Sequence, residues 1–434
     1  MKEKLRNFFE GKKVLILGFG REGHSTLELI KEFDCRIGIS DQNLSVTSEL
    51  TQYELFSGEN YLDAISGYDI VMKTPGIALF DKLSEKDKLK VTGQTDLLLR
   101  FCENKIIGVT GTKGKSTTSS LIHHIFEHCG KKSVLIGNIG IPPLTITDSI
   151  EKDTIIICEM SCHQLEYVQA SPNIAILLNV YEEHLDHYVD FNAYRQAKEN
   201  IYRFQSCNDI LIYNKDCYNK ELDAIPSKKI SASQSDEADI YISEKNIVLN
   251  GEIISYEKIA PKLEGGHNLY NIAVAVAAAA ECSCDLKAAV ESIHSFNGLE
   301  HRMELVRTVN GVKYINDSIS TIPLATINAV KAFSADTVII GGMDRGISYD
   351  VLVEYLNTGA VSNIICLPDS GYRIADMLNT DLNIFRATGM EDAVNKAYYV
   401  TKKCCVLSPA AASYGFYKNF EERGKHFKEL VNKL

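Results

Sequence analysis

The residues with the clearest chemical potential form a glycine-rich turn at positions 105–118, KIIGVTGTKGKSTT. A β-branched run at 106–109 leads into the turn, and residues 117–129 after it show apolar side chains at helical spacing. Glycines let backbone N–H groups curl around a polyphosphate, and a helix N-terminus adds partial positive charge. In such a turn Lys115 meets the β- and γ-phosphates and Ser116 binds Mg²⁺. We therefore predict an ATP-type phosphate site formed by Gly111, Thr112, Lys113, Gly114, Lys115, Ser116 and Thr117.

The spacing of this turn departs from a regular Walker A loop. That loop has a glycine five residues before the glycine of Gly-Lys-Ser, where this chain has Val109. The glycines present are Gly108, Gly111 and Gly114. Because Gly-Lys-Ser still stands at a strand-to-helix junction, phosphate binding remains the interpretation.

Two further groups follow apolar runs that are typical of buried parallel strands. Glu159 ends the run at 154–159, and His184 follows the run at 173–178, with Asp186 close in sequence. Since parallel strands end at one edge of a sheet, both groups are expected near the phosphate turn. Glu159 is a candidate Mg²⁺ ligand beside Ser116. His184 is a candidate second metal ligand, with a structural hydrogen bond as the alternative.

The N-terminal part has its own nucleotide-type pattern. A strand at 12–17 is followed by GFGREG at 18–23, and a second strand at 35–40 delivers Asp41, placed for a ribose or base. Such a turn holds many nucleotides. An NAD-dependent dehydrogenase would use it, but would leave the second phosphate turn without a role.

The C-terminal third contributes candidate contacts for three ligand groups: a phosphate, a ribose and a carboxylate. Arg302 follows an expected linker at 296–299 and is placed to clamp a phosphate, and Asp317 ends a strand and is placed for a ribose. Ser413, in the small-residue stretch after Leu407, and backbone N–H groups near Phe420 at the head of the last helix are placed to bind a carboxylate.

The pattern of elements predicts an α/β protein of three domains. We expect a Rossmann-like domain at 1–95, a central P-loop-type ATPase domain with a mainly parallel sheet at 96–298, and a Rossmann-like domain at 299–434. Strands in the last are expected at 312–315, 337–340, 363–366 and 404–407, and alternation around Asn250-Gly251 predicts a hairpin.

Composition excludes several classes. A net charge of −11 argues against nucleic-acid binding. No apolar run reaches the ~18 residues that span a bilayer, so no membrane partner is expected. The N-terminus lacks a cleavable signal. The twelve cysteines lack zinc spacing and indicate reduced thiols in a cytoplasmic protein.

The motifs together resemble the Mur ligase family along the whole chain. They are TGTKGKST (110–117), EMSCHQLE (159–166), NVYEEHLDHY (179–188), YRQAK (194–198), HNLYN (267–271), HRME (301–304), NDS (316–318) and SPAAASYGFYKNFEERG (408–424). The last motif is the most discriminating: it is similar to the family member that adds glutamate and unlike the others.

The resemblance implies roles for residues that spacing alone does not single out. Lys198 matches a lysine that family members carry as a carbamate. With it, Lys115 and His184 are the expected catalytic residues. Two Mg²⁺ ions are expected at Ser116, Glu159, His184 and Lys198. The adenine nucleotide is expected at Asn268, Asn271, Arg302 and Asp317. UDP-N-acetylmuramoyl-L-alanine is expected at Asp41, Gln42 and Asn138, and glutamate at Thr321, Arg345, Ser413 and Phe420.

The implied activity is an ATP-dependent amide ligation through an acyl phosphate, in cytoplasmic peptidoglycan precursor synthesis by a monomer. One stretch departs from the family, which usually reads NDSKATN after the strand, whereas this chain has Ile319 in place of the lysine. Arg345 is expected to supply the charge instead. Members with a DSxST-type stretch are thought to use L-glutamate. D-glutamate is nevertheless favoured, on the weight of the family as a whole, with L-glutamate and a folylpolyglutamate-type ligase as alternatives.

Overall fold

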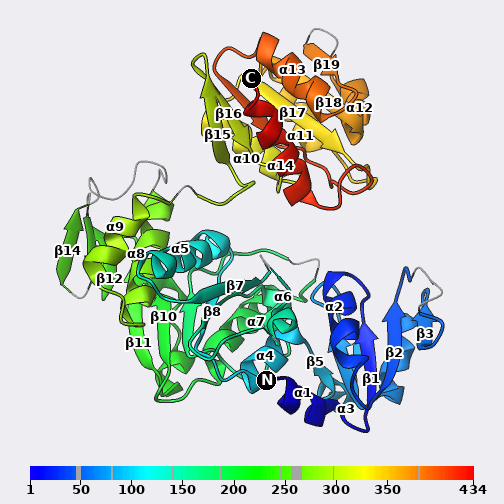
Figure 1. Cartoon of the computed structure of the whole chain (residues 1–434), viewed down its shortest axis with the longest axis vertical. Coiled ribbons are helices and arrows are strands. Elements are labelled where there is room, and N and C mark those ends of the chain that lie inside the picture. Colours follow the sequence, from blue (N-terminus) through cyan, green and yellow to red (C-terminus); the bar gives the residue numbers. More distant parts are fainter. Residues whose placement is uncertain are drawn as a thin grey trace. The chain divides into compact units, whose positions relative to one another are not determined.

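The computed structural model shows an α/β chain of two compact units, residues 1–296 and 297–434 (Figure 1). The structure describes residues 1–44, 50–79, 82–138, 141–147, 149–184, 187–235, 237–243, 246–249, 251–255, 266–296, 298–379 and 382–434. The units meet in the sequence at Phe296 and Asn297, within the expected linker. The first unit holds two sheets and the second holds one. The predicted division into three domains stays a prediction.

The first sheet is parallel and has the strand order β3-β2-β1-β4-β5. Apolar side chains from both of its faces are buried, in agreement with the Rossmann-like pattern expected here. Its strands are β1 (Lys13–Leu17), β2 (Arg36–Asp41), β3 (Glu54–Ser57), β4 (Ile70–Lys73) and β5 (Val91–Thr92), with the helices α1 (Lys2–Phe9), α2 (Arg21–Ile30), α3 (Glu85–Lys88) and α4 (Gln94–Phe101).

The second sheet has nine strands among the described residues, in the order β14-β13-β12-β11-β10-β9-β6-β8-β7. All neighbours pair in parallel except β12–β13 and β13–β14. The strands are β6 (Ile106–Thr110), β7 (Ser133–Gly137), β8 (Ile155–Glu159), β9 (Ile174–Leu177), β10 (Ile210–Asn214), β11 (Lys228–Ser233), β12 (Ile240–Ser243), β13 (Asn246–Leu249) and β14 (Glu252–Ser255).

Helices cover both faces of this second sheet. One face packs on α5 (Lys115–His128), α8 (Gly266–Ala280) and α9 (Leu286–Ile293), and the other on α4, α6 (Cys162–Leu165) and α7 (Phe191–Arg203). Leu121 and Phe126 of α5 are buried, as the helical spacing predicted. Leu249 of β13 pairs antiparallel with Glu252 of β14, which confirms the predicted hairpin, although Asn250 itself lies outside the described residues.

The second unit contains a six-stranded sheet in the order β15-β16-β20-β17-β18-β19, parallel except for β15–β16. Its strands are β15 (Glu304–Val309), β16 (Val312–Asn316), β17 (Thr337–Gly342), β18 (Asn363–Asp369), β19 (Asn383–Arg386) and β20 (Cys404–Leu407). Its helices are α10 (Pro323–Phe333), α11 (Asp350–Asn357), α12 (Ser370–Met377), α13 (Met390–Val400) and α14 (Phe420–Val431).

Two edge strands of the second unit were not predicted from the sequence, and neither were β3, β5, β10 and β11 of the first unit. The edge strand β15, ELVRTV, has no buried residue, and β19 is a four-residue edge strand with exposed ends. Neither carries the continuous apolar run that marks a buried strand. The four predicted strands of this unit are confirmed as β16, β17, β18 and β20.

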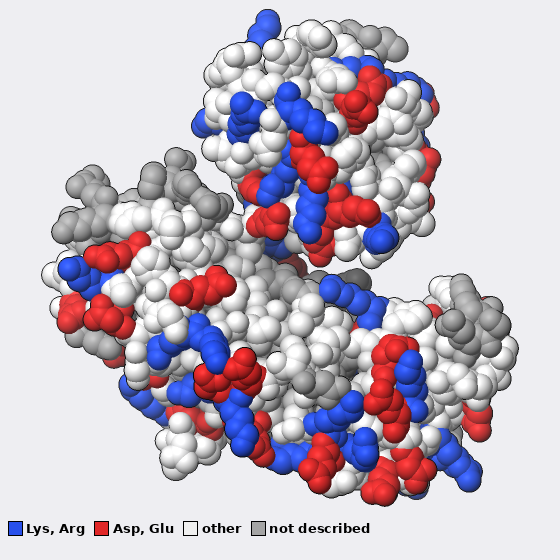
Figure 2. All heavy atoms as spheres, viewed as in Figure 1, with Lys and Arg blue, Asp and Glu red and all other residues white. Residues whose placement is uncertain are grey.

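The surface charges are mixed and the cysteines are unpaired. On the face drawn in Figure 2, Lys and Arg alternate with Asp and Glu over both units. All twelve cysteines are free, and only Cys207 is exposed. Among the described residues, no helix is long and apolar enough to cross a membrane.

Candidate active site

The phosphate turn joins β6 to α5 and is shaped by two glycines. Gly111 has φ +158° and Gly114 has φ +87°, a region that L side chains rarely adopt. Gly114 is the N-cap of α5 and has no side-chain cap, so the N–H groups of the first helical turn face the end of the helix unsatisfied by a side chain. The α5 helix begins at Lys115, two residues earlier than the sequence predicted.

The turn is braced by a residue that sequence reasoning missed. The Asn179 Oδ1 atom accepts a hydrogen bond from the Lys113 backbone N–H at 2.8 Å, and its Nδ2 donates to the Lys113 carbonyl at 3.0 Å. The Lys115 Nζ donates to the carbonyls of Gly111 and Thr112 at 2.8 and 3.1 Å. The lysine amine thus lies over the turn, where a polyphosphate would be held.

Glu159 lies on the strand next to the one that enters the turn. It pairs in register with Val109 of β6 and is fully buried. Its Oε1 accepts a hydrogen bond from Asn138 Nδ2 at 2.8 Å, whereas its buried Oε2 has no hydrogen-bond partner. An unsatisfied carboxylate oxygen beside a phosphate turn is what a divalent cation would complete. The residues present therefore fit the expected Mg²⁺.

Lys198 is buried at the same edge of the sheet. The apolar stripe of α7 carries it inward, because it lies one turn after Tyr194 and one turn before Ile201. Its Nζ donates to the Gly111 carbonyl at 3.0 Å and lies 4.8 Å from the centre of the Tyr194 ring. Burial, and then the charge of Lys115, lowers the pKa of Lys198 to about 8.

A cluster of aromatic and imidazole rings adjoins Lys198. The Tyr194 hydroxyl is 2.8 Å from Thr112 Oγ1, so α7 is tied to the phosphate turn. His184 is exposed and its backbone has φ +59°. The centre of its ring lies 6.0 Å from the centre of the Tyr194 ring and 4.9 Å from the centre of the His163 ring. Asp186 lies outside the described residues. Within the described part of the chain, no group of three His, Cys, Asp or Glu side chains is arranged to hold a metal ion.

Two of the expected nucleotide contacts lie on α8, in the first unit. Asn271 is 4% exposed and packs against the phosphate turn, since a Cβ on Gly114 would lie 2.6 Å from its Oδ1. Asn268 is half-buried one turn earlier. The structure therefore brings Asn271 to the phosphate turn, a contact that the sequence pattern alone did not reveal.

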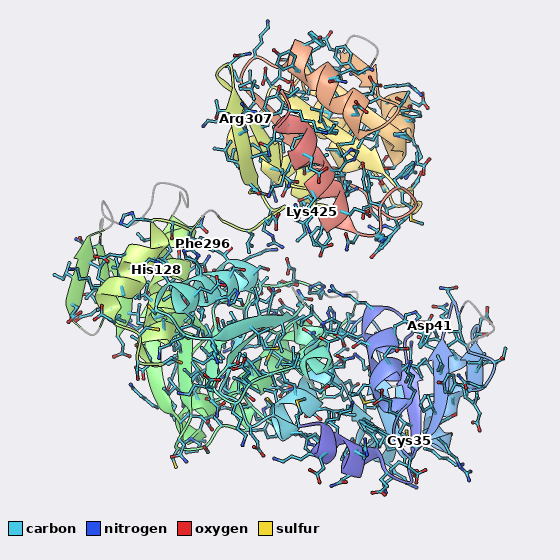
Figure 3. The ribbon with its side chains drawn as sticks, in the orientation of Figure 1. Cys35, Asp41, His128, Phe296, Arg307 and Lys425 are labelled. Atoms are coloured by element: carbon cyan, nitrogen blue, oxygen red, sulfur yellow. The ribbon has the colours of Figure 1, made fainter. Side chains whose placement is uncertain are left out.

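The expected substrate contacts of the first unit surround two cavities. Asp41, at the carboxyl end of β2 (Figure 3), accepts the Phe19 N–H at 2.7 Å and lines a cavity of about 680 Å³. Asn138 lines a second cavity of about 230 Å³, together with Thr74 after β4 and Gln164 of α6. Gln42 is exposed and does not line either cavity. The second cavity therefore lies between the two sheets of this unit.

Within the second unit, Asp317 is buried and both of its carboxylate oxygens are occupied. Oδ1 accepts the Met303 N–H at 3.1 Å and Oδ2 accepts the Ser408 hydroxyl at 2.8 Å. Burial raises the pKa of Asp317 above its ordinary value. Arg302 is exposed. The ribose contact expected of Asp317 would require one of these oxygens to be shared.

All four expected glutamate contacts belong to the second unit, and the segments that hold Arg345 and Ser413 are joined by a hydrogen bond from the Met343 N–H to the Ala412 carbonyl at 2.9 Å. Arg345 is exposed and its Nη2 donates to the Thr321 carbonyl at 3.3 Å. The Phe420 carbonyl accepts the Ser318 hydroxyl at 2.8 Å. Ser413 is buried and lines a cavity of about 760 Å³ that the other three do not line.

Comparison with known proteins places the chain. The family description "Mur ligase middle domain" matches residues 109–279. UDP-N-acetylmuramoylalanine--D-glutamate ligase of Clostridium kluyveri is 32% identical over 460 residues, covering 100% of this chain and 99% of the relative. The protein of that name from Clostridium botulinum strain Langeland is 30% identical and covers 99% of both chains.

Solved structures agree in fold. UDP-N-acetylmuramate-alanine ligase MurC from Thermotoga maritima matches with a TM-score of 0.56 at 19% identity, covering 97% of this chain and 99% of that one. MurF ligase from Thermotoga maritima in complex with ADP matches with a TM-score of 0.53 at 16% identity, covering 99% and 97%. The chain belongs to the Mur ligase family, whose members are ATP-dependent ligases. Both full-length relatives cited above are, by name, D-glutamate ligases.

Proposed function

We propose that this chain joins D-glutamate to UDP-N-acetylmuramoyl-L-alanine with hydrolysis of ATP to ADP and phosphate, in the cytoplasm and as a monomer. The proposal rests on the set of groups found at one edge of the second sheet. There the phosphate turn, a carboxylate with an unsatisfied oxygen (Glu159) and a buried amine (Lys198) lie together. The names of the two full-length relatives supply the substrates.

The proposed reaction begins with the substrate carboxylate, which is a poor electrophile. One of its oxygens attacks the γ-phosphorus of ATP, ADP leaves, and an acyl phosphate forms. The glutamate amine then attacks the acyl carbon, and phosphate leaves through a tetrahedral intermediate. Lys115 and the N–H groups at the head of α5 would stabilise charge on the transferred phosphoryl group, an effect commonly worth several kcal/mol.

Mg²⁺ would be held by Ser116 and Glu159, with His184 and a carbamylated Lys198 at a second position. When bound, the ion neutralises charge on the phosphate oxygens. The neutral form of Lys198 is the form that adds CO₂. At pH 7.5 an amine of pKa about 8 is roughly one quarter neutral, against about 0.1% for an ordinary lysine. The carbamate would turn a cation that repels Mg²⁺ into a ligand.

A first experiment measures phosphate release with ATP, Mg²⁺ and UDP-N-acetylmuramoyl-L-alanine, offering D-glutamate and L-glutamate in parallel. Release with D-glutamate is the expected result. Release with L-glutamate alone would keep the ligase chemistry and assign the other epimer, the alternative that rests on Ile319 and the stretch around it. Release with neither epimer would refute the proposal, and a folate substrate in a parallel tube tests the folylpolyglutamate alternative.

The metal assignment is tested with Glu159→Gln, which keeps the shape of the side chain. The variant should need at least about 10-fold more Mg²⁺ for half-maximal phosphate release, because the oxygen without a protein partner is replaced or neutralised. Glu151→Gln is the matched control, since Glu151 is an exposed carboxylate that pairs with Lys132. An unchanged Mg²⁺ requirement in Glu159→Gln would remove Glu159 from the metal site.

A further inference from the structure

Residues 343–349, the Arg345 segment, join the carboxyl end of β17 to α11. The head of α12 packs on this end of the strand (Figure 1). The Ser370 hydroxyl of α12 donates to the Gly342 carbonyl at 2.8 Å, and a Cβ on Gly371 would lie 2.9 Å from a backbone oxygen of β17. The first turn of α12 is therefore held closely against the strand that leads into the Arg345 segment.

An arginine three residues further along α12 holds the Arg345 segment at three points. The Arg373 Nε lies 2.7 Å from Asp344 Oδ2, and its Nη2 donates to Asp344 Oδ1 at 2.9 Å and to the Ile347 carbonyl at 2.8 Å. The guanidinium carbon lies 4.8 Å from the centre of the ring of Tyr349, which is buried. A guanidinium that meets both oxygens of one carboxylate fixes its direction as well as its distance.

The carboxylate held by Arg373 is next to Arg345 in the sequence. Asp344 Oδ1 also accepts the Gly346 N–H at 2.9 Å, so the same side chain closes the turn after Arg345. Arg345 itself is exposed and donates to the backbone carbonyl of Thr321, and no carboxylate of the described residues lies within ion-pair distance of its guanidinium. Without Arg373, the Asp344 carboxylate would be an unpaired anion beside that guanidinium.

We propose that Arg373 is a positioning residue for the ligation: through Asp344 it keeps Arg345 in place to bind a carboxylate of the incoming glutamate. The inference rests on the proposed function. Arg373 fixes the backbone of the Arg345 segment. It also occupies the Asp344 carboxylate, which would otherwise compete with glutamate for the Arg345 guanidinium. Both effects act on the binding of glutamate, and neither requires Arg373 to touch the substrate.

The test compares Arg373→Gln with the parent chain in phosphate release, at varied concentrations of each substrate. The KM for D-glutamate, or for L-glutamate if that is the epimer used, should rise at least about 5-fold, as expected for residues coupled in one hydrogen-bond network. The KM values for ATP and for UDP-N-acetylmuramoyl-L-alanine should stay within about 2-fold of the parent values. Arg373→Lys keeps the charge but not the fork of donors, so its KM for glutamate should lie between the two.

Arg386 of β19 provides a matched control in the same unit. It pairs with the Asp376 carboxylate and its guanidinium carbon lies 5.2 Å from the centre of the Tyr372 ring, so it has the same kinds of partner as Arg373. Asp376, however, is not next to a candidate site residue. Arg386→Gln should therefore keep every KM value within about 2-fold of the parent. Equal rises in the KM for glutamate in both variants would overturn the inference.

A double variant separates positioning from a general structural role. If Arg373 acts through Arg345, adding Arg373→Gln to Arg345→Gln should raise the KM for glutamate no further than Arg345→Gln alone. Additive effects of the two substitutions, equal rises in the KM of all three substrates, or an unchanged KM for glutamate in either single variant would overturn the inference. If Arg373→Gln does not fold, the same comparison made with Arg373→Lys decides.

Amide hydrogen exchange separates this inference from the proposed function. The Gly346 amide should exchange at least about 5-fold faster in Arg373→Gln than in the parent, because its acceptor Asp344 is no longer held, whereas the amide of Ile339 in buried β17 should be unaffected. Unchanged exchange at Gly346 would overturn the inference even where the parent is an active ligase. Turnover of neither epimer by the parent would refute the proposed function, and with it the role in glutamate binding, while faster exchange at Gly346 would still show that Arg373 holds the segment.

Discussion

Replacing Lys198 by methionine should abolish the ligase reaction and yet stabilise the fold. Lys198 is 1% exposed, and burial lowers its pKa from 10.5 to about 8. The protonated amine is thus less favourable in the folded chain than in the unfolded one. Methionine has a similar length, is apolar, and packs adaptably in irregular interiors.

The size of the gain follows from the pKa difference. A change of about 2.5 pKa units corresponds to about 3 kcal/mol of unfavourable free energy in the protonated state at neutral pH. The variant also loses the hydrogen bond from Nζ to the Gly111 carbonyl, worth about 1 kcal/mol. We therefore expect Lys198→Met to raise the free energy of unfolding by about 2 kcal/mol at pH 7.

The gain should depend on pH in a defined direction. Between pH 8 and 10.5 the unfolded chain binds more protons at this lysine than the folded chain does, so the stability of the parent rises with pH in that window. The advantage of the variant should accordingly be full below pH 8, fall as the pH rises, and become a deficit of about 1 kcal/mol above pH 10.5, where only the lost hydrogen bond remains. Urea unfolding of both chains at several pH values, in CO₂-depleted buffer, measures the difference.

Lys220→Met provides the control for this experiment, because Lys220 is an exposed lysine of the same unit. It should have little effect on stability at any of these pH values. Parallel stability curves for the parent and Lys198→Met from pH 7 to 10.5 would refute the reasoning that burial perturbs this amine.

In phosphate release, Lys198→Ala should recover activity in part with added short-chain carboxylates, and full activity without them would refute the carbamate.

Two further changes test the packing around the site. Gly114→Ala places a Cβ 2.6 Å from Asn271 Oδ1 at a residue with φ +87°, and should raise the ATP concentration for half-maximal rate at least about 10-fold. The control is Gly130→Ala, which has φ +67° and nothing within 4 Å of the added Cβ, and which should leave that ATP concentration unchanged. Equal effects of the two substitutions would contradict the contact with Asn271. Lys73→Met leaves Glu166, its largely buried partner at 3.2 Å, without that cation, and should cost about 3 kcal/mol in urea unfolding. The double variant with Glu166→Leu should regain most of the loss, and no recovery would argue against the pair.

Much of the fold could be predicted from the sequence because its signals are local. The apolar run of β6, the glycines after it and the spacing of Leu121 and Phe126 in α5 each depend on neighbours within one or two turns of chain. The same holds for the strand that ends in Glu159. Edge strands such as β15 escaped prediction because their residues are not buried.

The order of residues along the chain was enough to place chemical groups at the ends of particular strands and to reveal the resemblance of the motifs to one family. The burial and pairing of those groups became clear from the folded chain, because they depend on residues that are far apart in the sequence. The Lys198 amine is buried against the Gly111 carbonyl, 87 residues away, and Arg423 is held by Ser318, 105 residues away. Burial by distant parts of the chain, and then the charge of Lys115, lowers the pKa of Lys198, and the buried Arg423 guanidinium has only neutral acceptors among the described residues. No local pattern in the sequence encodes either state.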